Sequence, residues 1–375
     1  MEWKKVKLGE VAYYVQTKSR HKELTQEDYI STENMLPNKR GIIVASSTIP
    51  ECYTKFQPCD ILISNIRPYF QKIWFANRYG GCSNDVLCIR GDEKVIPVYL
   101  YYLLSQDIFF DYVMLGSKGT KMPRGDKNQI MQYEFPLPPL ETQHRIAAIL
   151  SSLDDKIENN NRINRNLEAQ AQALFKSWFV DFEPWGGKMP EDWKEGTLGE
   201  IADITMGQSP RGESYNTQGE GVIFYQGCSD FGDRFPSVRM FTTEPARYAV
   251  SNSILMSVRA PVGTMNVALE ECCIGRGLAS LKEKNGYDSF LLYLLESLQN
   301  VFDSYNGDGT VFGSINKKSI GNIKIVIPSY EVVESFHKMV SPLDKKIKFN
   351  HQESARLATL RDTLLPKLMK GEIEV

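Results

Sequence analysis

The chain has 375 residues, of which 42% are hydrophobic and 24% are charged, and its formal net charge is −2. This length predicts two or three globular domains, and no apolar run reaches the roughly 20 residues that a membrane-spanning helix requires. The N-terminal residues lack the apolar core of a signal peptide, and the seven cysteines include no CxxC pair or zinc-like spacing. We therefore expect a cytoplasmic protein with reduced thiols and no membrane partner.

The chain consists of two similar halves. The Trp-Lys pair and the Leu-Gly-Glu-Val-Ala run within residues 3–12 return, with Ile in place of Val, within residues 193–202, a shift of 193 − 3 = 190. Leu153 likewise returns as Leu343, and 343 − 153 is again 190. Solenoid and propeller repeats are only roughly 20–50 residues long, so we predict one domain-plus-helix unit that occurs twice. Two such units suit a partner with two-fold geometry, and duplex DNA with paired half-sites is the leading example.

The two halves differ in charge. Residues 1–140 contain 18 Lys and Arg against 15 Asp and Glu, or 18 − 15 = +3, whereas residues 190–330 contain 12 against 17, or −5. A net negative domain is a poor non-specific binder of polyanions. DNA affinity of the second half would therefore have to come from local patches or from a partner subunit.

Within each half, the elements are expected in the same order. Runs rich in Ile, Val, Leu and aromatics, bounded by turn residues, predict strands at 41–45, 60–66 and 86–89, and at 221–225, 253–258 and 278–281. A helix is predicted next, at 98–110 or 289–302, followed by a Gly-rich loop at 116–127 or 306–318 and a strand that ends in proline. The fold class is thus α+β, with two similar mixed α/β domains in a pseudo-two-fold internal repeat.

A long helix is predicted after each domain. From Ile146 to Trp178 the core positions recur at intervals of four and three residues, and the same series shifted by 190 runs from Phe336 to Leu368. Both series carry a polar layer at their middle, and the middles of two helices meet only in an antiparallel pair. A shifted register would leave an amide unpaired at a cost of about 1–3 kcal/mol. We therefore predict an antiparallel coiled coil formed by Leu153, Ile157, Asn160, Asn164, Leu167, Leu343, Ile347, Asn350 and Leu357.

Two qualifications apply to the helices. Each helix could instead lie separately on its own domain, although such helices need a broader apolar stripe. The Ser341-Pro342 pair predicts that the second helix begins or kinks at Pro342, after a short helix over 332–340, and Pro366 is expected to end or bend its last turn.

Three motifs resemble sequences of a known family. Residues 174–182 (LFKSWFVDF) resemble the central signature of specificity subunits of type I restriction–modification systems, and residues 364–373 (LLPKLMKGEI) resemble their C-terminal signature. Residues 138–143 (PPLETQ) resemble the usual beginning of their first helical region, so the resemblance covers the whole chain. It implies target-recognition domain 1 at 1–140, a central long helix at 141–182, a linker with target-recognition domain 2 at 183–329, and a C-terminal long helix at 330–375.

The resemblance also implies a function and partners. The chain would be a non-catalytic subunit that reads a bipartite DNA site with its two domains, which the helices hold apart, and that docks two methyltransferase subunits on those helices. Restriction subunits could join the complex. S-adenosylmethionine, ATP and Mg would bind to the partner subunits, with no cofactor in this chain. One departure is that Leu365-Pro366 stands where the first helix has Phe175-Lys176, so the two docking ends are expected to differ.

The residues themselves predict no catalytic or metal site. The only Pro-Pro pair lacks the preceding Asn or Asp and the following aromatic residue of an adenine methyltransferase loop, and no GxxxxGK[ST] sequence is present for ATP. The four histidines are scattered. A self-contained methyltransferase is therefore disfavoured. A coiled-coil scaffold that binds proteins without reading DNA remains an alternative, which the acidic second half favours.

Candidate DNA contacts lie at strand ends and in the Gly-rich loops. An Arg just after a strand could read guanine, grip phosphate or form a structural ion pair, and this applies to Arg67 and to Arg259 in the counterpart segment. The glycines of the loops allow close backbone approach to DNA, although a solvated loop is the plain alternative. The expected contacts are Asn65, Arg67, Tyr69, Lys118, Thr120, Lys121, Arg124, Lys127, Arg259, Arg276, Thr310, Lys317 and Lys318.

Overall fold

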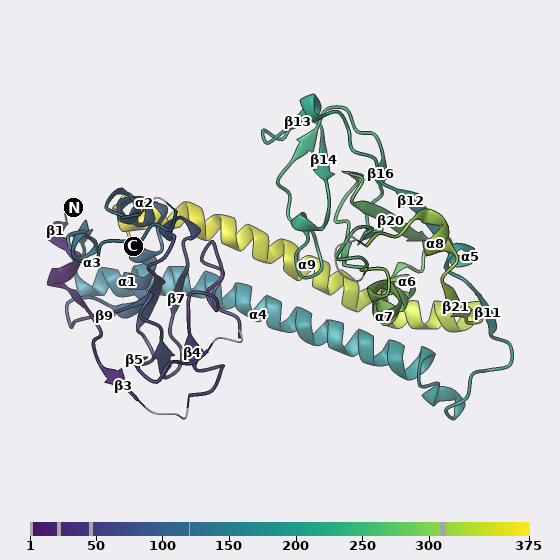
Figure 1. Cartoon of the computed structure of the whole chain (residues 1–375), viewed down its shortest axis with the longest axis horizontal. Coiled ribbons are helices and arrows are strands. Elements are labelled where there is room, and N and C mark those ends of the chain that lie inside the picture. The colour runs from purple at the N-terminus through teal and green to yellow at the C-terminus, as the bar shows by residue number, and fades with distance from the viewer. Residues whose placement is uncertain (1–2, 21–23, 45–47, 120, 308–312) are drawn as a thin grey trace. The chain divides into compact units, whose positions relative to one another are not determined.

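The computed structural model describes residues 3–20, 24–44, 48–119, 121–307 and 313–375 (Figure 1). The chain divides into two compact units: a first unit of residues 1–159 with 353–375, and a second unit of residues 160–352. Each unit contains one globule, which we define as residues 3–137 or 193–327, with half of α4 (Leu140–Phe179) and half of α9 (Tyr330–Met369). No described helix is long and apolar enough to cross a membrane.

The described part of the first globule contains two four-stranded sheets and a strand pair. The pair joins β1 (Lys4–Lys7) to β10 (Glu134–Leu137), which brings the beginning and end of the globule together. One sheet is antiparallel, in the order β2–β9–β6–β7, and the other has the order β3–β5–β8–β4, with β4 parallel to β8. The bounds are β2 (Ala12–Tyr14), β3 (Lys18–Ser19), β4 (Tyr29–Ile30), β5 (Tyr53–Phe56), β6 (Ile61–Ser64), β7 (Ile73–Phe75), β8 (Gly80–Cys82), β9 (Val86–Gly91), α1 (Pro97–Leu104), α2 (Asp107–Leu115) and α3 (Lys127–Ile130).

Strand β6 contributes side chains to a core on each face of the antiparallel sheet. Ile61 and Ile63 pack in a core with residues of α1, α2 and α4, whereas Leu62 packs in a second core with residues of the other sheet. Successive side chains of a strand point to opposite faces, so this sheet is the middle layer of three. Because both faces of the sheet are covered, every side chain of Ile61–Ile63 is buried, and the sequence of β6 is therefore a continuous apolar run.

The second globule repeats this arrangement. β11 (Lys194–Thr197) pairs with β21 (Lys324–Ile327), and the antiparallel sheet has the order β12–β20–β17–β18. The second sheet has the order β13–β15–β14–β19–β16, with β14 parallel to β19. The bounds are β12 (Ala202–Met206), β13 (Tyr215–Asn216), β14 (Val222–Tyr225), β15 (Phe241–Thr242), β16 (Tyr248–Ala249), β17 (Ile254–Ser257), β18 (Met265–Val267), β19 (Cys272–Ile274), β20 (Leu278–Glu283), α5 (Leu198–Ile201), α6 (Asp288–Ser297), α7 (Gln299–Asp303) and α8 (Lys317–Gly321).

Two local predictions differ from the structure. The strand expected at 41–45 is wrong over its described residues, where Ile42 forms only an isolated bridge with Met35. Ile43 and Val44 are exposed, so no sheet face stabilises a strand there. The helix expected at 98–110 is two helices, because α1 ends at Leu104 and α2 begins at Asp107, and the helix expected at 289–302 likewise divides into α6 and α7.

Helices α4 and α9 run antiparallel within each unit. In the first unit, Asp154 pairs with Arg361 at 2.6 Å and Lys156 with Glu353 at 3.4 Å, so numbers rise along α4 as they fall along α9. In the second unit, Asn164 forms a hydrogen bond with Asn350, and the ring centroids of Phe175 and Phe336 lie 5.8 Å apart. Here too, residue numbers rise along α4 as they fall along α9. None of the nine expected helix-pairing residues is exposed.

The second helix does not begin at Pro342, and no separate short helix precedes it over 332–340. α9 is one helix from Tyr330 to Met369, and it also continues past Pro366. Proline removes one backbone donor and disfavours the helix interior. Here Phe336, Val340 and Ile347 are buried on both sides of Pro342, so packing holds the helix continuous across it.

The polar layer of the helices contains a direct amide pair in the second unit. Asn350 Nδ2 donates to Asn164 Oδ1 at 2.9 Å, and Asn164 Nδ2 donates to the backbone oxygen of Ile347 at 3.3 Å. Asn160 and Asn350 are both buried. A shift of 190 makes Asn160 the counterpart of Asn350, and the antiparallel pairing of the two middles predicts that they lie close together, whereas this hydrogen bond joins Asn350 to Asn164, the other asparagine of the α4 layer.

Candidate nucleic-acid interface

In the first unit, the segment after β6 pairs with the Gly-rich loop. Ile66 and Arg124 form an antiparallel bridge. The Arg67 N–H donates to the oxygen of Pro123 at 2.8 Å, and the Gly125 N–H donates to that of Asn65 at 3.2 Å. The two groups of residues that the sequence singled out therefore form one surface.

Local geometry holds this surface in place. Arg67 has φ 49°, in the left-handed region, and leads into the turn that begins at Pro68. A Cβ on Gly125 would lie 2.9 Å from Asn65 Oδ1 and 2.8 Å from Val113 Cγ1, so a larger residue there would have to displace these side chains. Asp126 then caps α3 by accepting from two backbone N–H groups.

The loop cations differ in how they are paired. Lys118 Nζ lies 2.8 Å from Asp126, and this contact, with the backbone donors of α3, holds the pKa of Asp126 below its ordinary value. Arg124 Nη2 lies 3.2 Å from Asp85. By contrast, among the described residues no ion pair engages Arg67, Lys121 or Lys127, all of which are exposed and available to a phosphate.

The other two candidates in this segment have different environments. Tyr69 is 49% exposed and could contact a ligand, whereas Asn65 is 8% exposed. Asn65 lies beneath Gly125 and holds the loop through its backbone oxygen, and the burial of its side chain disfavours direct contact with a base. Thr120 lies outside the described residues.

The second unit has the same strand–loop construction. Arg259 forms an antiparallel bridge with Ser314, the Ala260 N–H donates to the oxygen of Gly313 at 3.1 Å, and the Ile315 N–H donates to that of Val258 at 3.0 Å. Asn316 caps α8, as Asp126 caps α3.

This register shows that Arg259 is not the structural counterpart of Arg67, although the sequence analysis compared the two. The matching bridges place Arg259 at the position of Ile66, and Ala260 at the position of Arg67. Opposed residues of an antiparallel pair share a face, so Arg259 and Arg124 stand on the same face from opposite strands. The counterpart of Asp85 is Gly277, which accepts from Val258 N–H as Asp85 accepts from Asn65 N–H, so Arg259 lacks that carboxylate neighbour.

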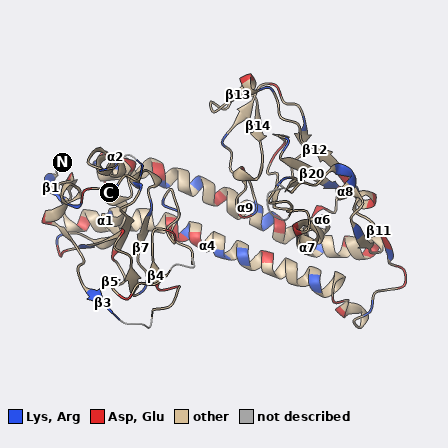
Figure 2. Cartoon of the chain, in the orientation of Figure 1, with Lys and Arg blue, Asp and Glu red and all other residues tan. Residues whose placement is uncertain are grey.

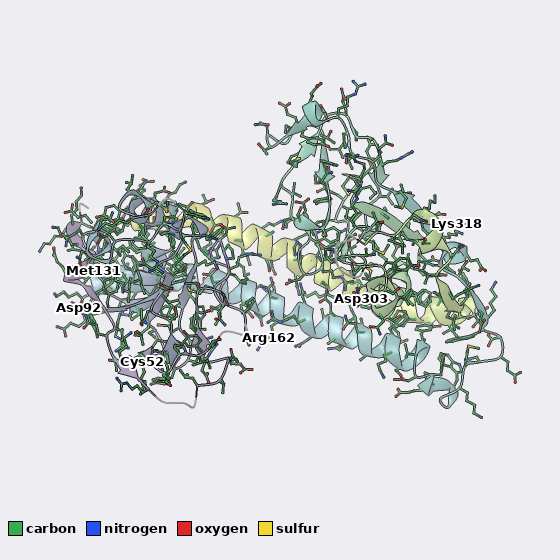
Figure 3. All side chains as sticks on the ribbon, viewed as in Figure 1. Cys52, Asp92, Met131, Arg162, Asp303 and Lys318 are labelled. Carbon is green, nitrogen blue, oxygen red and sulfur yellow. The ribbon has the colours of Figure 1, made fainter. Side chains whose placement is uncertain are left out.

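Further cations of the second unit are exposed. Lys317 and Lys318 begin α8, where Figure 2 shows basic residues, and Lys318 lies at its surface in Figure 3. Arg276 lies apart from them, in the connection between β19 and β20, with its N–H donating to Ser209 Oγ at 3.3 Å. Thr310 lies outside the described residues.

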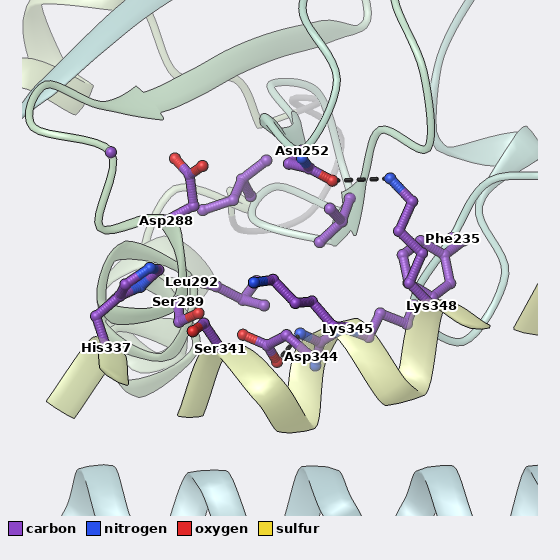
Figure 4. Close-up of a pocket in the computed structure, with 14 residues that line it drawn as sticks. Phe235, Asn252, Asp288, Ser289, Leu292, His337, Ser341, Asp344, Lys345 and Lys348 are labelled. Atoms are coloured by element: carbon purple, nitrogen blue, oxygen red, sulfur yellow. Dashed lines mark hydrogen bonds and ion pairs between the residues drawn. The ribbon is translucent and has the colours of Figure 1, made fainter. Parts of the chain in front are cut away.

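A cavity of about 230 Å³ lies between α9 and the second globule (Figure 4). Its charged groups are largely engaged with neighbours: Lys348 Nζ donates to Asn252 Oδ1 at 2.9 Å, and Arg234 pairs with Asp344 at 2.5 Å. Small-molecule sites are typically about 300–1,000 Å³, and duplex DNA is far larger. The cavity is therefore part of the packing of the globule on α9.

The apolar residues of the two helix-end motifs pack against the cores of their units. Phe175 is buried and packs against Phe290 and Phe336, and Leu365 and Leu368 are buried in the first unit. The difference between the two motifs thus changes how each helix end packs within its own unit.

Two surface clefts contain polar residues that the sequence analysis missed. One, of about 380 Å³, includes Lys18 and Asn84, and the other, of about 640 Å³, includes Gln208 and Gln226 beside Arg276. The sequence contained one signal that could have pointed to these clefts, because the shift of 190 aligns Lys18 with Gln208. Over the described residues, no three His, Cys, Asp or Glu side chains cluster as a metal site would require.

Comparisons with known proteins agree with this arrangement. A family model described as the type I restriction modification DNA specificity domain matches twice, at residues 1–169 and 190–359. A Methanocaldococcus jannaschii protein described as the specificity subunit of the type I restriction enzyme MjaX is 34% identical over 306 residues, covering 78% of this chain and 72% of that protein. The HindI specificity subunit of Haemophilus influenzae is 24% identical over 99% of this chain and 100% of its own length. A crystal structure of the type I restriction–modification S subunit from M. genitalium shares the fold, with a TM-score of 0.65, 20% identity, and coverage of 98% of this chain and 96% of that chain.

Proposed function

Since the chain belongs to the family of type I restriction–modification DNA specificity subunits, we propose that it reads a bipartite site in duplex DNA, one half with each globule. The observation that carries this proposal is the repeated strand–loop surface. Ile66 bridges Arg124 in the first unit, and Arg259 bridges Ser314 in the second, each pair beside exposed cations. Two similar frames with different side chains are what two different half-sites require.

The two long helices have the second role in this proposal. They form an antiparallel coiled coil that sets the spacing between half-sites and docks two methyltransferase subunits. Support comes from the antiparallel contacts within each unit and from the Asn164–Asn350 pair, because a buried amide pair selects one register.

Catalysis is assigned to the partners. In this proposal the chain itself carries no catalytic group, and S-adenosylmethionine, ATP and Mg bind to methyltransferase and restriction subunits. The assembled complex acts in the cytoplasm. The excess of acidic residues in the second half, −5 over residues 190–330, leaves part of the phosphate binding to the partners.

Co-expression with the cognate methyltransferase subunit tests the proposal. The purified complex should shift duplex DNA in a gel, and sequencing of methylated adenines in host DNA should yield one two-part motif. A complex that assembles but neither prefers any sequence nor methylates a motif would instead support a protein-binding scaffold.

A further inference from the structure

The two surface clefts occupy equivalent places in the two globules. In the first, Ser83 N–H donates to the oxygen of Ile30 at 3.0 Å beside the parallel pair β4–β8. In the second, Gly275 N–H donates to the oxygen of Tyr225 at 2.8 Å beside the parallel pair β14–β19. The connection 83–85 therefore corresponds to the connection 275–277, and Asn84 corresponds to Arg276.

The opposite wall of each cleft is also equivalent. Tyr14 pairs with Ile89 in the sheet of the first globule, and Ile204 pairs with Leu281 at the same register in the second. Four residues further along, Lys18 lines the first cleft, and Gln208 lines the second. Each cleft thus presents the same two positions, occupied by different side chains.

The four side chains at these positions are exposed and polar. Lys18 Nζ donates to Asn84 Oδ1 at 2.7 Å and to Thr54 Oγ1 at 2.9 Å, which holds Asn84 in place and leaves its Nδ2 and the second lone pair of its Oδ1 for a base edge. In the second cleft, Ser209 Oγ accepts from Gln226 Nε2 at 3.1 Å and from the Arg276 N–H at 3.3 Å. Hydrogen bonds therefore order the Lys18–Asn84 pair of the first cleft and the backbone at Arg276 in the second.

Each cleft adjoins the strand–loop surface of its own globule. The Asn65 N–H donates to the oxygen of Asp85, next to Asn84, and the Val258 N–H donates to that of Gly277, next to Arg276. A duplex held by the exposed cations of the strand–loop surface would thus bring base edges near the cleft.

We propose that these clefts are base-reading sites of the two globules, with Lys18 and Asn84 each reading a base of the first half-site and Gln208 and Arg276 each reading a base of the second. This rests on the proposed function. Arg and Lys pair with guanine, and Asn and Gln pair bidentately with adenine, in the major groove. Each half-site therefore contains a guanine and an adenine read by these two positions.

The test uses the full chain in complex with its methyltransferase subunit. Competition binding to single-base variants of the methylated motif is measured for Arg276→Gln and Asn84→Ala. Arg276→Gln should lower discrimination at one guanine of the second half-site by about 10- to 100-fold, and Asn84→Ala should do so at one adenine of the first. Arg247→Gln, at an exposed arginine of the second unit outside the cleft, is the matched control and should leave the motif unchanged.

The outcomes separate this inference from the proposed function. A wild-type complex with no sequence preference overturns the proposed function. If the wild-type complex recognises a motif and both variants recognise the same motif, only the assignment of the clefts is overturned. The same holds if the variants weaken binding equally on every DNA sequence. If Arg276→Gln does not assemble, Arg276→Lys retains the charge without the bidentate fork and is measured in the same way. Failure of both to assemble would make Arg276 a structural residue and also overturn the assignment.

Discussion

The hydroxyl of Tyr102 donates a 2.6 Å hydrogen bond to Asp154 on α4, and the same pair recurs as Tyr293 and Asp344 on α9, at 2.8 Å. An arginine completes each site, but from a different source. In the first unit Arg361 comes from α9, whereas in the second unit Arg234 comes from the globule and also reaches Glu168. Arg361 of α9 corresponds, by the shift of 190, to Ala171 of α4, which is buried. Helix α4 therefore supplies no arginine to the second site.

This difference predicts unequal sensitivity to loss of the aspartate. The Arg234 side chain is 9% exposed and that of Arg361 is 29% exposed. Asp344→Ala leaves a buried cation partly uncompensated and should reduce the free energy of unfolding by about 3 kcal/mol, more than Asp154→Ala does. Urea unfolding of the full chain measures both, and equal losses would contradict the argument from burial.

The amide pair between the helices predicts a double-mutant signature. Asn164→Leu or Asn350→Leu alone leaves one amide facing hydrocarbon and should cost about 1–3 kcal/mol of unfolding free energy. The double variant removes both amides and should be close to the wild type in stability. Additive losses in a double-mutant cycle would show that the two amides do not act as a pair.

Helix length is expected to set the spacing of the DNA site. Inserting four residues after Asn160 adds about 6 Å and about 1.1 turns to α4, so the facing sides are roughly kept. Base pairs are stacked at about 3.4 Å, so the methylated motif should gain about two spacer positions with both half-sequences unchanged. Sequencing of methylated DNA checks this, and retained activity with the original spacer would rule out the helices as a ruler.

Arg67 and Lys121 are expected to contribute differently to DNA binding. Lys121→Ala should weaken binding to all sequences alike and lower the salt slope by about one phosphate contact. Arg67→Ala should cost about 1–3 kcal/mol and relax one position of the first half-site only. Competition binding across a salt series distinguishes them. Equal weakening of every sequence by Arg67→Ala would make it a phosphate contact.

Acidification is expected to destabilise the second unit through two histidines of α9. Burial lowers the pKa of His337, against an opposing effect of Asp288, and burial also lowers the pKa of His351, whose ring lies 4.8 Å from Phe235. A depressed folded-state pKa means that their contribution to stability is present above the unfolded value of about 6.5 and is lost as the pH falls through the folded pKa. Thermal unfolding of wild type and of a His337→Gln, His351→Gln double variant between pH 7.5 and 5 measures this. The double variant should lose less stability on acidification, and exposed His144→Gln is the control.

The sequence by itself determined the repeated unit and the positions of most of its elements. A strand such as β6 and a helix such as α4 are visible in local periodicity, because each side chain's burial follows from its place in a regular element. The shift of 190 then related the second half to the first without any knowledge of contacts. The motifs of the two helix ends were sufficient to indicate the family.

Only the tertiary structure decided how residues distant in sequence are matched. The bridge register places Arg259 opposite Ser314 and offsets it by one position from Arg67, which a comparison of arginine-containing segments could not resolve. Lys18 meets Asn84 across 66 residues, and Arg234 meets Asp344 across 110. Pro342 remains helical for the same reason, because the packing of Phe336, Val340 and Ile347 outweighs the local preference of proline. Strand register and helix packing depend on free energies summed over many long-range contacts. A local pattern of residue types does not contain these contacts, so it does not predict the register or the packing.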